Sequence, residues 1–91
     1  MEVIFSRHVL DKIANELSRI GVTRDLIESI VRSPDEILYD TATNRYIAVK
    51  FDQKIAVIYE RRDQQVFIVT AIYSSGIENI VRRRKRSGRW I

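Results

Sequence analysis

The hydrophobic periodicity of the chain changes at Pro34, and this change limits its fold more than any other feature. Before Pro34, apolar residues recur every three or four positions, as they do on the buried face of a helix. After Pro34, runs rich in Ile, Val, Tyr and Phe alternate with short polar links, which is typical of strands joined in hairpins. Helices followed by strands predict an α+β fold.

Two helices are predicted within residues 6–33. The first begins after Ser6, a suitable N-cap, and ends at Gly21, which can adopt the left-handed conformation found at helix C-termini. Thr23 caps the second helix, which ends before Pro34 because the residue preceding a proline is driven out of helical geometry. The link between the two helices is short, so they are predicted to form a helical hairpin.

Four antiparallel strands are predicted to follow, in a meander sheet on which the helical hairpin packs. The links between the strands are short and suit hairpins rather than crossovers. Val3–Phe5 is either a further strand or an apolar lead that packs under the helices, and Ile77–Val81 can form one more helical turn. The predicted strands are residues 36–40, 45–52, 54–61 and 65–74.

A length of 91 residues indicates a single domain, because two separate cores would each bury too little apolar surface. The chain has no cysteine and only 1 histidine, which excludes disulfides, thiolate metal sites and multi-histidine zinc centres. We therefore expect no metal and no other cofactor. The N-terminus does not fit a signal peptide, and no apolar run reaches the roughly 20 residues that span a bilayer. A cytoplasmic protein without membrane contact is expected.

The positive charge of the chain is concentrated near its C-terminus. Of the 16 Lys and Arg residues, 6 lie within residues 82–91, and all 12 acidic residues precede them. Residues 1–81 therefore carry a net charge of −2, although the whole chain carries +4. The sequence predicts a domain of residues 1–81 followed by a basic C-terminal tail of residues 82–91.

The predicted tail has the composition of a nucleic-acid-binding segment. Clustered arginines bind phosphates and release counterions, and an exposed Trp90 can stack on an unpaired base. Three alternatives remain open: the tail is simply solvated, it docks on an acidic antitoxin-like protein, or Trp90 and Ile91 form a hydrophobic plug that ties the C-terminus to the sheet. The predicted nucleic-acid-binding residues are Arg82, Arg83, Arg84, Lys85, Arg86, Arg89 and Trp90.

Three residues outside the tail are candidates for chemistry. Histidine is the side chain most often used for proton transfer, and His8 is either a plain surface residue or an acid/base group at the start of the first helix. Lys50 interrupts an apolar strand, so it either points to solvent or meets a phosphate. Tyr73 lies close to the basic segment in sequence, although packing on a sheet is the ordinary role of a strand tyrosine.

The order of several short motifs resembles a family of short prokaryotic and viral proteins of uncharacterised function, grouped by fold with the RelE/ParE-like toxins. The resemblance covers nearly the whole chain. The motifs that carry it are Phe5–His8, Gly21–Thr23 with Leu26–Val31 and Ser33–Asp35, Arg45–Lys50 with Ala56–Tyr59, and Phe67–Tyr73.

The resemblance implies a toxin-type RNA endonuclease that uses no metal. In that interpretation His8 is the acid/base, Lys50, Arg84 and Arg86 neutralise the phosphate, and Tyr73 helps to orient it. The implied partners are RNA or another nucleic acid and an acidic antitoxin-like protein. Apolar positions on both faces of the sheet further suggest a homodimer. The alternative is a non-catalytic module that binds nucleic acid or another protein.

Overall fold

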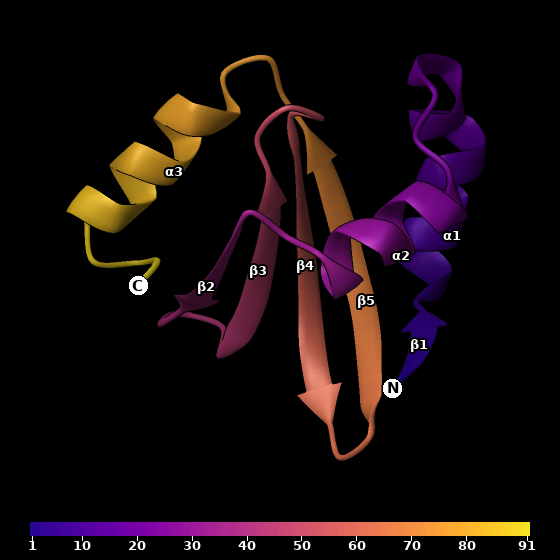
Figure 1. Ribbon diagram of the computed structural model, residues 1–91, viewed down its shortest axis with the longest axis horizontal. Coiled ribbons are helices and arrows are strands. Elements are labelled where there is room, and N and C mark those ends of the chain that lie inside the picture. Colours follow the sequence, from indigo (N-terminus) through magenta and orange to yellow (C-terminus); the bar gives the residue numbers. More distant parts are fainter.

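A five-stranded sheet forms the centre of the computed structural model, which describes residues 1–91 (Figure 1). Its strands lie in the order β1-β5-β4-β3-β2. β1 pairs with β5 in parallel, and all other neighbours pair antiparallel. The strands are β1 (Glu2–Phe5), β2 (Glu36–Asp40), β3 (Arg45–Lys50), β4 (Ile55–Arg62) and β5 (Gln65–Tyr73).

The α+β class is confirmed, but the prediction of a four-stranded antiparallel sheet is wrong. The apolar lead Val3–Phe5 lies in β1, which pairs in parallel with β5 and makes the sheet five-stranded and mixed. Val3 lies opposite Val66 in this pairing. A strand of 4 residues has too short a pattern to be distinguished from a packed lead, and its partner lies near the other end of the chain.

Two α-helices and a 3-10 helix pack on one face of the sheet. The N-caps predicted from the sequence are confirmed, since the Val9 amide donates to Ser6 Oγ at 3.1 Å and the Leu26 amide donates to Thr23 Oγ1 at 3.2 Å. The Ser6 hydroxyl also donates to the Val69 carbonyl at 2.8 Å, which ties the start of the first helix to β5. The helices are α1 (Arg7–Asn15), η1 (Leu17–Ile20) and α2 (Arg24–Arg32).

The first helix is shorter than predicted, so the expected simple hairpin of two α-helices is wrong in detail. α1 ends at Asn15, and the chain continues as the tighter helix η1 until Gly21, whose φ is 81°. Leu17 enters the core, whereas Ile20 is 51% exposed. Apolar residues three positions apart fit a 3-10 helix as well as an α-helix, so the pattern alone did not separate the two.

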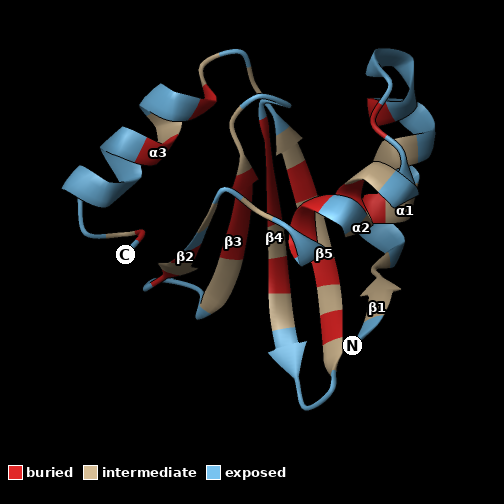
Figure 2. Ribbon diagram, viewed as in Figure 1, coloured by how far each residue is buried: buried red, intermediate tan, exposed pale blue.

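The sheet separates two hydrophobic cores, one on each face (Figure 2). Side chains alternate along each strand, so in β3 Ala48 packs with α1 and α2, while Ile47 and Val49 point to the opposite face. The second core is closed by three residues from the C-terminal part of the chain, namely Ile77, Val81 and Trp90.

The C-terminal residues, predicted as a basic tail, form a helix and a short return segment that pack on the sheet. The helical turn predicted at 77–81 continues through five basic residues to form α3 (Ile77–Arg86). The chain then turns back and runs antiparallel along the outer edge of β2, where Trp90 lies opposite Asp40. Burial of Trp90 in the second core explains why this segment is ordered. None of the helices is both long and apolar enough to span a membrane.

Candidate nucleic-acid interface

The outward face of α3 carries a row of arginines. Val81 and Ile77 face the sheet, so Asn79, Arg82, Arg83 and Arg86, which are spaced i, i+3, i+4 and i+7, share the exposed face. Arg82 donates to Asn79 Oδ1 at 2.9 Å. None of the three arginines takes part in an ion pair within the protein. We call Arg82, Arg83 and Arg86 the arginine stripe; its charge is available to an anionic partner.

The other two basic residues of α3 lie closer to the sheet and have partners. Lys85 Nζ forms an ion pair with Glu36 at the start of β2. The Arg84 guanidinium lies over the Trp90 ring, 5.9 Å from its centroid, and has no carboxylate partner. The charge of Lys85 is therefore compensated, whereas Arg84 adds to the positive charge of the stripe.

A buried carboxylate holds the end of the chain, and with it α3, against the sheet. Asp40 Oδ1 accepts a hydrogen bond from Arg89 Nε at 3.2 Å, and its Oδ2 accepts one from Trp90 Nε1 at 3.2 Å. The amides of Ala42 and Thr43 donate to Oδ1 at 2.8 and 3.2 Å. Asp40 is 7% exposed and Trp90 is 4% exposed. We call Asp40, Arg89 and Trp90 the Asp40 clasp.

The Asp40 clasp is an ionic arrangement at neutral pH. Burial by itself raises the pKa of Asp40, but the hydrogen bonds from Arg89, from the Ala42 and Thr43 amides and from Trp90 outweigh burial and lower the pKa to about 2. A buried carboxylate with this many donors stays charged, because each donor stabilises the anion. Arg89 and Trp90, two of the predicted binding residues, therefore have a structural role: they hold the C-terminus of the chain against β2.

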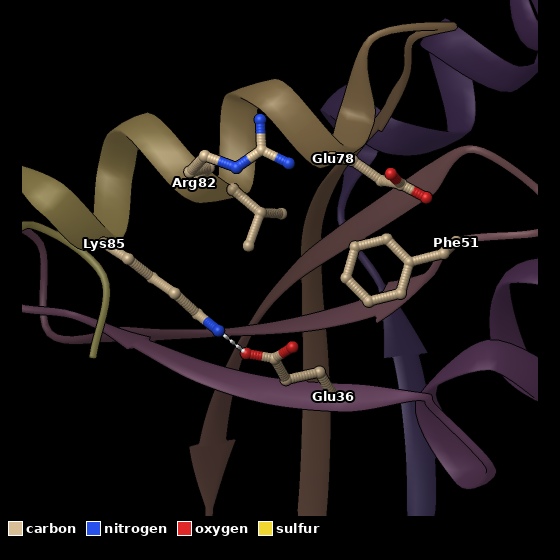
Figure 3. Close-up of a pocket in the computed structure, with 6 residues that line it drawn as sticks. Glu36, Phe51, Glu78, Arg82 and Lys85 are labelled. Carbon is tan, nitrogen blue, oxygen red and sulfur yellow. Dashed lines mark ion pairs between the residues drawn. The ribbon is translucent and has the colours of Figure 1, made fainter.

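Hollows lie on both sides of α3. The mixed hollow, lined by two acidic and two basic residues, has a volume of 310 Å³, and Figure 3 shows Lys85 turned towards Glu36 on one side of it, with Glu78 on the same side as the Phe51 ring. The basic hollow has a volume of 450 Å³ and lies between α3 and β5. The residues that line the mixed hollow are Glu36, Phe51, Glu78, Val81, Arg82 and Lys85, and those that line the basic hollow are Ile72, Ile80, Arg83, Arg84 and Ser87.

His8 lies apart from the basic surface. It is exposed in the first turn of α1. There it lines a hollow together with Asp11, Lys12, Asn15 and Glu16. α1 packs on one face of the sheet and α3 on the other, so the sheet stands between His8 and the arginine stripe. The structure does not bring together the acid/base and the phosphate-binding arginines that the resemblance implies.

Lys50 and Tyr73 lie at one end of the sheet, on strands either side of β4, on the same face as α1 and α2. Both residues are in register with Ile55, which belongs to the core on that face. Lys50 Nζ pairs with Asp35 Oδ1 at 3.2 Å, so its charge has a partner. Tyr73 is 44% exposed. Neither residue shares a hollow or a hydrogen bond with His8 or with α3.

Sequence reasoning missed Asp40, which is central to the position of α3. An aspartate before Thr41 at a strand end is a recognisable turn signal, and the Ala42 and Thr43 amides do bind its carboxylate. Its bonds to Arg89 and Trp90 span 49 and 50 residues, and no local pattern indicates contacts at that separation.

No model of a protein family, no curated protein and no solved structure matches this chain. The structure also shows no group of three or more His, Asp or Glu side chains that could hold a metal ion. The chemistry of the interface therefore rests on its own residues: arginines without carboxylate partners, displayed on a helix that the Asp40 clasp holds in position.

Proposed function

We propose that the protein binds nucleic acid through the arginine stripe of α3 and acts as a binding module without a catalytic centre. The observation that carries this proposal is the absence of any internal carboxylate partner for Arg82, Arg83 and Arg86 on an ordered helix. Arginine binds phosphate bidentately, and each contact releases counterions from the nucleic acid. An ordered helix adds to affinity, because its backbone freedom is already lost before binding.

Removal of the arginine stripe should abolish most of the binding. If Arg82, Arg83, Arg84 and Arg86 each neutralise one phosphate, the slope of log K against log salt is about −3 to −4 on duplex nucleic acid. The triple variant Arg82→Ala, Arg83→Ala, Arg86→Ala should make this slope less steep by about 3 and weaken binding by about tenfold or more at low salt. Fluorescence anisotropy with a labelled oligonucleotide over a salt series measures both quantities.

A matched control removes the same charge from the opposite side of the sheet. Arg7, Arg19 and Arg24 are exposed and lie in α1, η1 and α2. Their triple substitution by alanine should leave the slope of the salt dependence nearly unchanged. Equal losses in the two triple variants would show that binding follows net charge alone, and would refute an interface at α3. Unchanged binding without the stripe would favour the alternative in which an acidic protein docks there.

RNA cleavage without a metal is the enzymatic alternative that the resemblance implies, and the geometry supports it less well. His8 lies across the sheet from the arginine stripe, and Lys50 is paired with Asp35. We expect labelled RNA, incubated with the protein in excess chelator with and without ribosomes, to be bound and not cut. His8→Ala should bind as the unchanged protein does. Discrete cleavage that disappears in His8→Ala would overturn the binding-module proposal and establish an endonuclease.

A further inference from the structure

We propose that the nucleic acid bound by α3 is double-stranded DNA, with α3 placed in the major groove. This inference rests on the proposed function, and it adds the class of ligand. Three features of the structure lead to it: the shape of the surface around α3, the kinds of side chain on its outer face, and the position of the nearby aromatic rings.

The shape of the surface makes α3 a ridge. The loop before Ile77 and the Asp40 clasp hold its two ends, and Ile77 and Val81 pack on the sheet, so the opposite face of the helix points to solvent. The mixed and basic hollows, of 310 and 450 Å³, lie on either side of it. A helix of 10 residues is about 15 Å long and about 10–12 Å across. The major groove of B-form DNA, about 12 Å wide, admits such a helix.

The side chains on the crest of the ridge are those that read base edges. Arginine pairs bidentately with O6 and N7 of guanine, and asparagine pairs with N6 and N7 of adenine. Asn79 and the arginine stripe lie on the exposed face of α3 and occupy about two turns of it. These groups can contact neighbouring base pairs when the helix lies in the groove.

The charges beside the ridge indicate which part of α3 meets the phosphates. The mixed hollow contains two carboxylates, Glu36 and Glu78, beside Arg82 and Lys85, and Lys85 is paired with Glu36, so this side of α3 offers phosphate little net attraction. The basic hollow contains Arg83 and Arg84 and no acidic residue. A DNA strand is therefore expected to run along the basic hollow, beside the C-terminal half of α3.

The aromatic rings near α3 do not form a platform for unpaired bases. Single-stranded nucleic acids are commonly held by bases stacked on exposed rings. Trp90 is 4% exposed and covered by Arg84, and Phe51 is half-buried beside two carboxylates. Double-stranded RNA fits the ridge poorly, because its major groove is too deep and narrow for side chains to read. Of the common nucleic-acid forms, B-form DNA matches best.

The test compares one base sequence in four forms: duplex DNA, duplex RNA, single-stranded DNA and single-stranded RNA. Anisotropy titrations of the full chain at about 0.1 M salt should give duplex DNA the highest affinity, by about tenfold or more over each other form. Equal or tighter binding of any other form would overturn the inference and leave the proposed function standing. Failure to bind any of the four, even at low salt, would overturn the proposed function itself.

A second measurement tests the groove. Methylation of guanine N7 blocks the major-groove edge, so it should prevent binding at some guanines of the duplex. Arg86→Lys, on the outward face of α3, keeps the charge but removes the bidentate geometry, and should weaken or abolish this interference while the slope of the salt dependence stays the same. Binding that is insensitive to N7 methylation would show contacts to the phosphates alone and overturn the major-groove placement.

Discussion

Replacement of Trp90 by alanine should lower the free energy of unfolding by about 3–5 kcal/mol, which is the usual cost of deleting a large buried aromatic side chain. Trp90 is 4% exposed, packs in the second core with Leu38 and Ile47, and donates its indole N–H to Asp40. The substitution leaves a cavity and removes one donor from a buried carboxylate, and both effects destabilise the folded state. Urea denaturation followed by circular dichroism measures the change.

Two further variants test whether the loss of stability comes from the buried Trp90 side chain itself. Ile91, the neighbour of Trp90, is 68% exposed, so Ile91→Ala should change the free energy of unfolding by no more than about 0.5 kcal/mol. Trp90→Phe keeps much of the apolar volume but loses the indole donor, and should cost about 1–3 kcal/mol. A loss below about 1 kcal/mol in Trp90→Ala would mean that the second core does not depend on the clasp.

Asp40→Asn should remove a pH-dependent part of the stability. The pKa of Asp40 is lowered from 3.8 to about 2 in the folded protein, a difference that corresponds to about 2 kcal/mol. Because the folded pKa lies below the unfolded one, this stabilisation is present above about pH 4 and is lost as the pH falls towards about 2. The unchanged protein should therefore lose more stability over that range than Asp40→Asn does.

The difference in stability between the unchanged protein and Asp40→Asn separates the effect of Asp40 from that of the other carboxylates. The pKa of Asp35 is also lowered, first by the Phe51 amide and then by Lys50, and that of Glu60 is lowered by Arg62 and Arg45. These groups contribute to acid unfolding equally in both proteins and cancel in the difference. If the gap in unfolding free energy between the unchanged protein and Asp40→Asn stays constant from about pH 6 to about pH 2, Asp40 is not the group responsible.

Much of the fold could be predicted because its signals are local. Thr23 and Pro34 mark the ends of α2, and the alternation of side chains in β3 shows its two faces. The parts that sequence reasoning missed depend on distant contacts. β1 is a strand because β5 lies beside it, and α3 extends to Arg86 although a run of basic residues favours solvent over order.

In the candidate site, too, local features could be predicted and distant contacts could not. The basic residues were identified from composition, and the structure places five of them on one helix. Their different roles were not predictable, since Arg89 binds Asp40 across 49 residues while the arginine stripe has no carboxylate partner inside the protein. Of the two alternatives for Trp90, the hydrophobic plug matches its burial. The resemblance grouped His8 with the arginines. Whether they meet depends on which face of the sheet α1 and α3 cover, and the two helices cover opposite faces.

The long-range pairings of the sheet also set an order for folding during synthesis. β2, β3 and β4 are neighbours in the chain as well as in the sheet, so they can pair as soon as they leave the ribosome. β1 must wait for β5, and the Asp40 clasp beyond the far end of α3 cannot form until Arg89 and Trp90 reach β2. We therefore expect a nascent chain to complete its sheet before the arginine stripe takes its final position. The positive charge of the stripe is then displayed in its final, ordered form only after Trp90 has been synthesised.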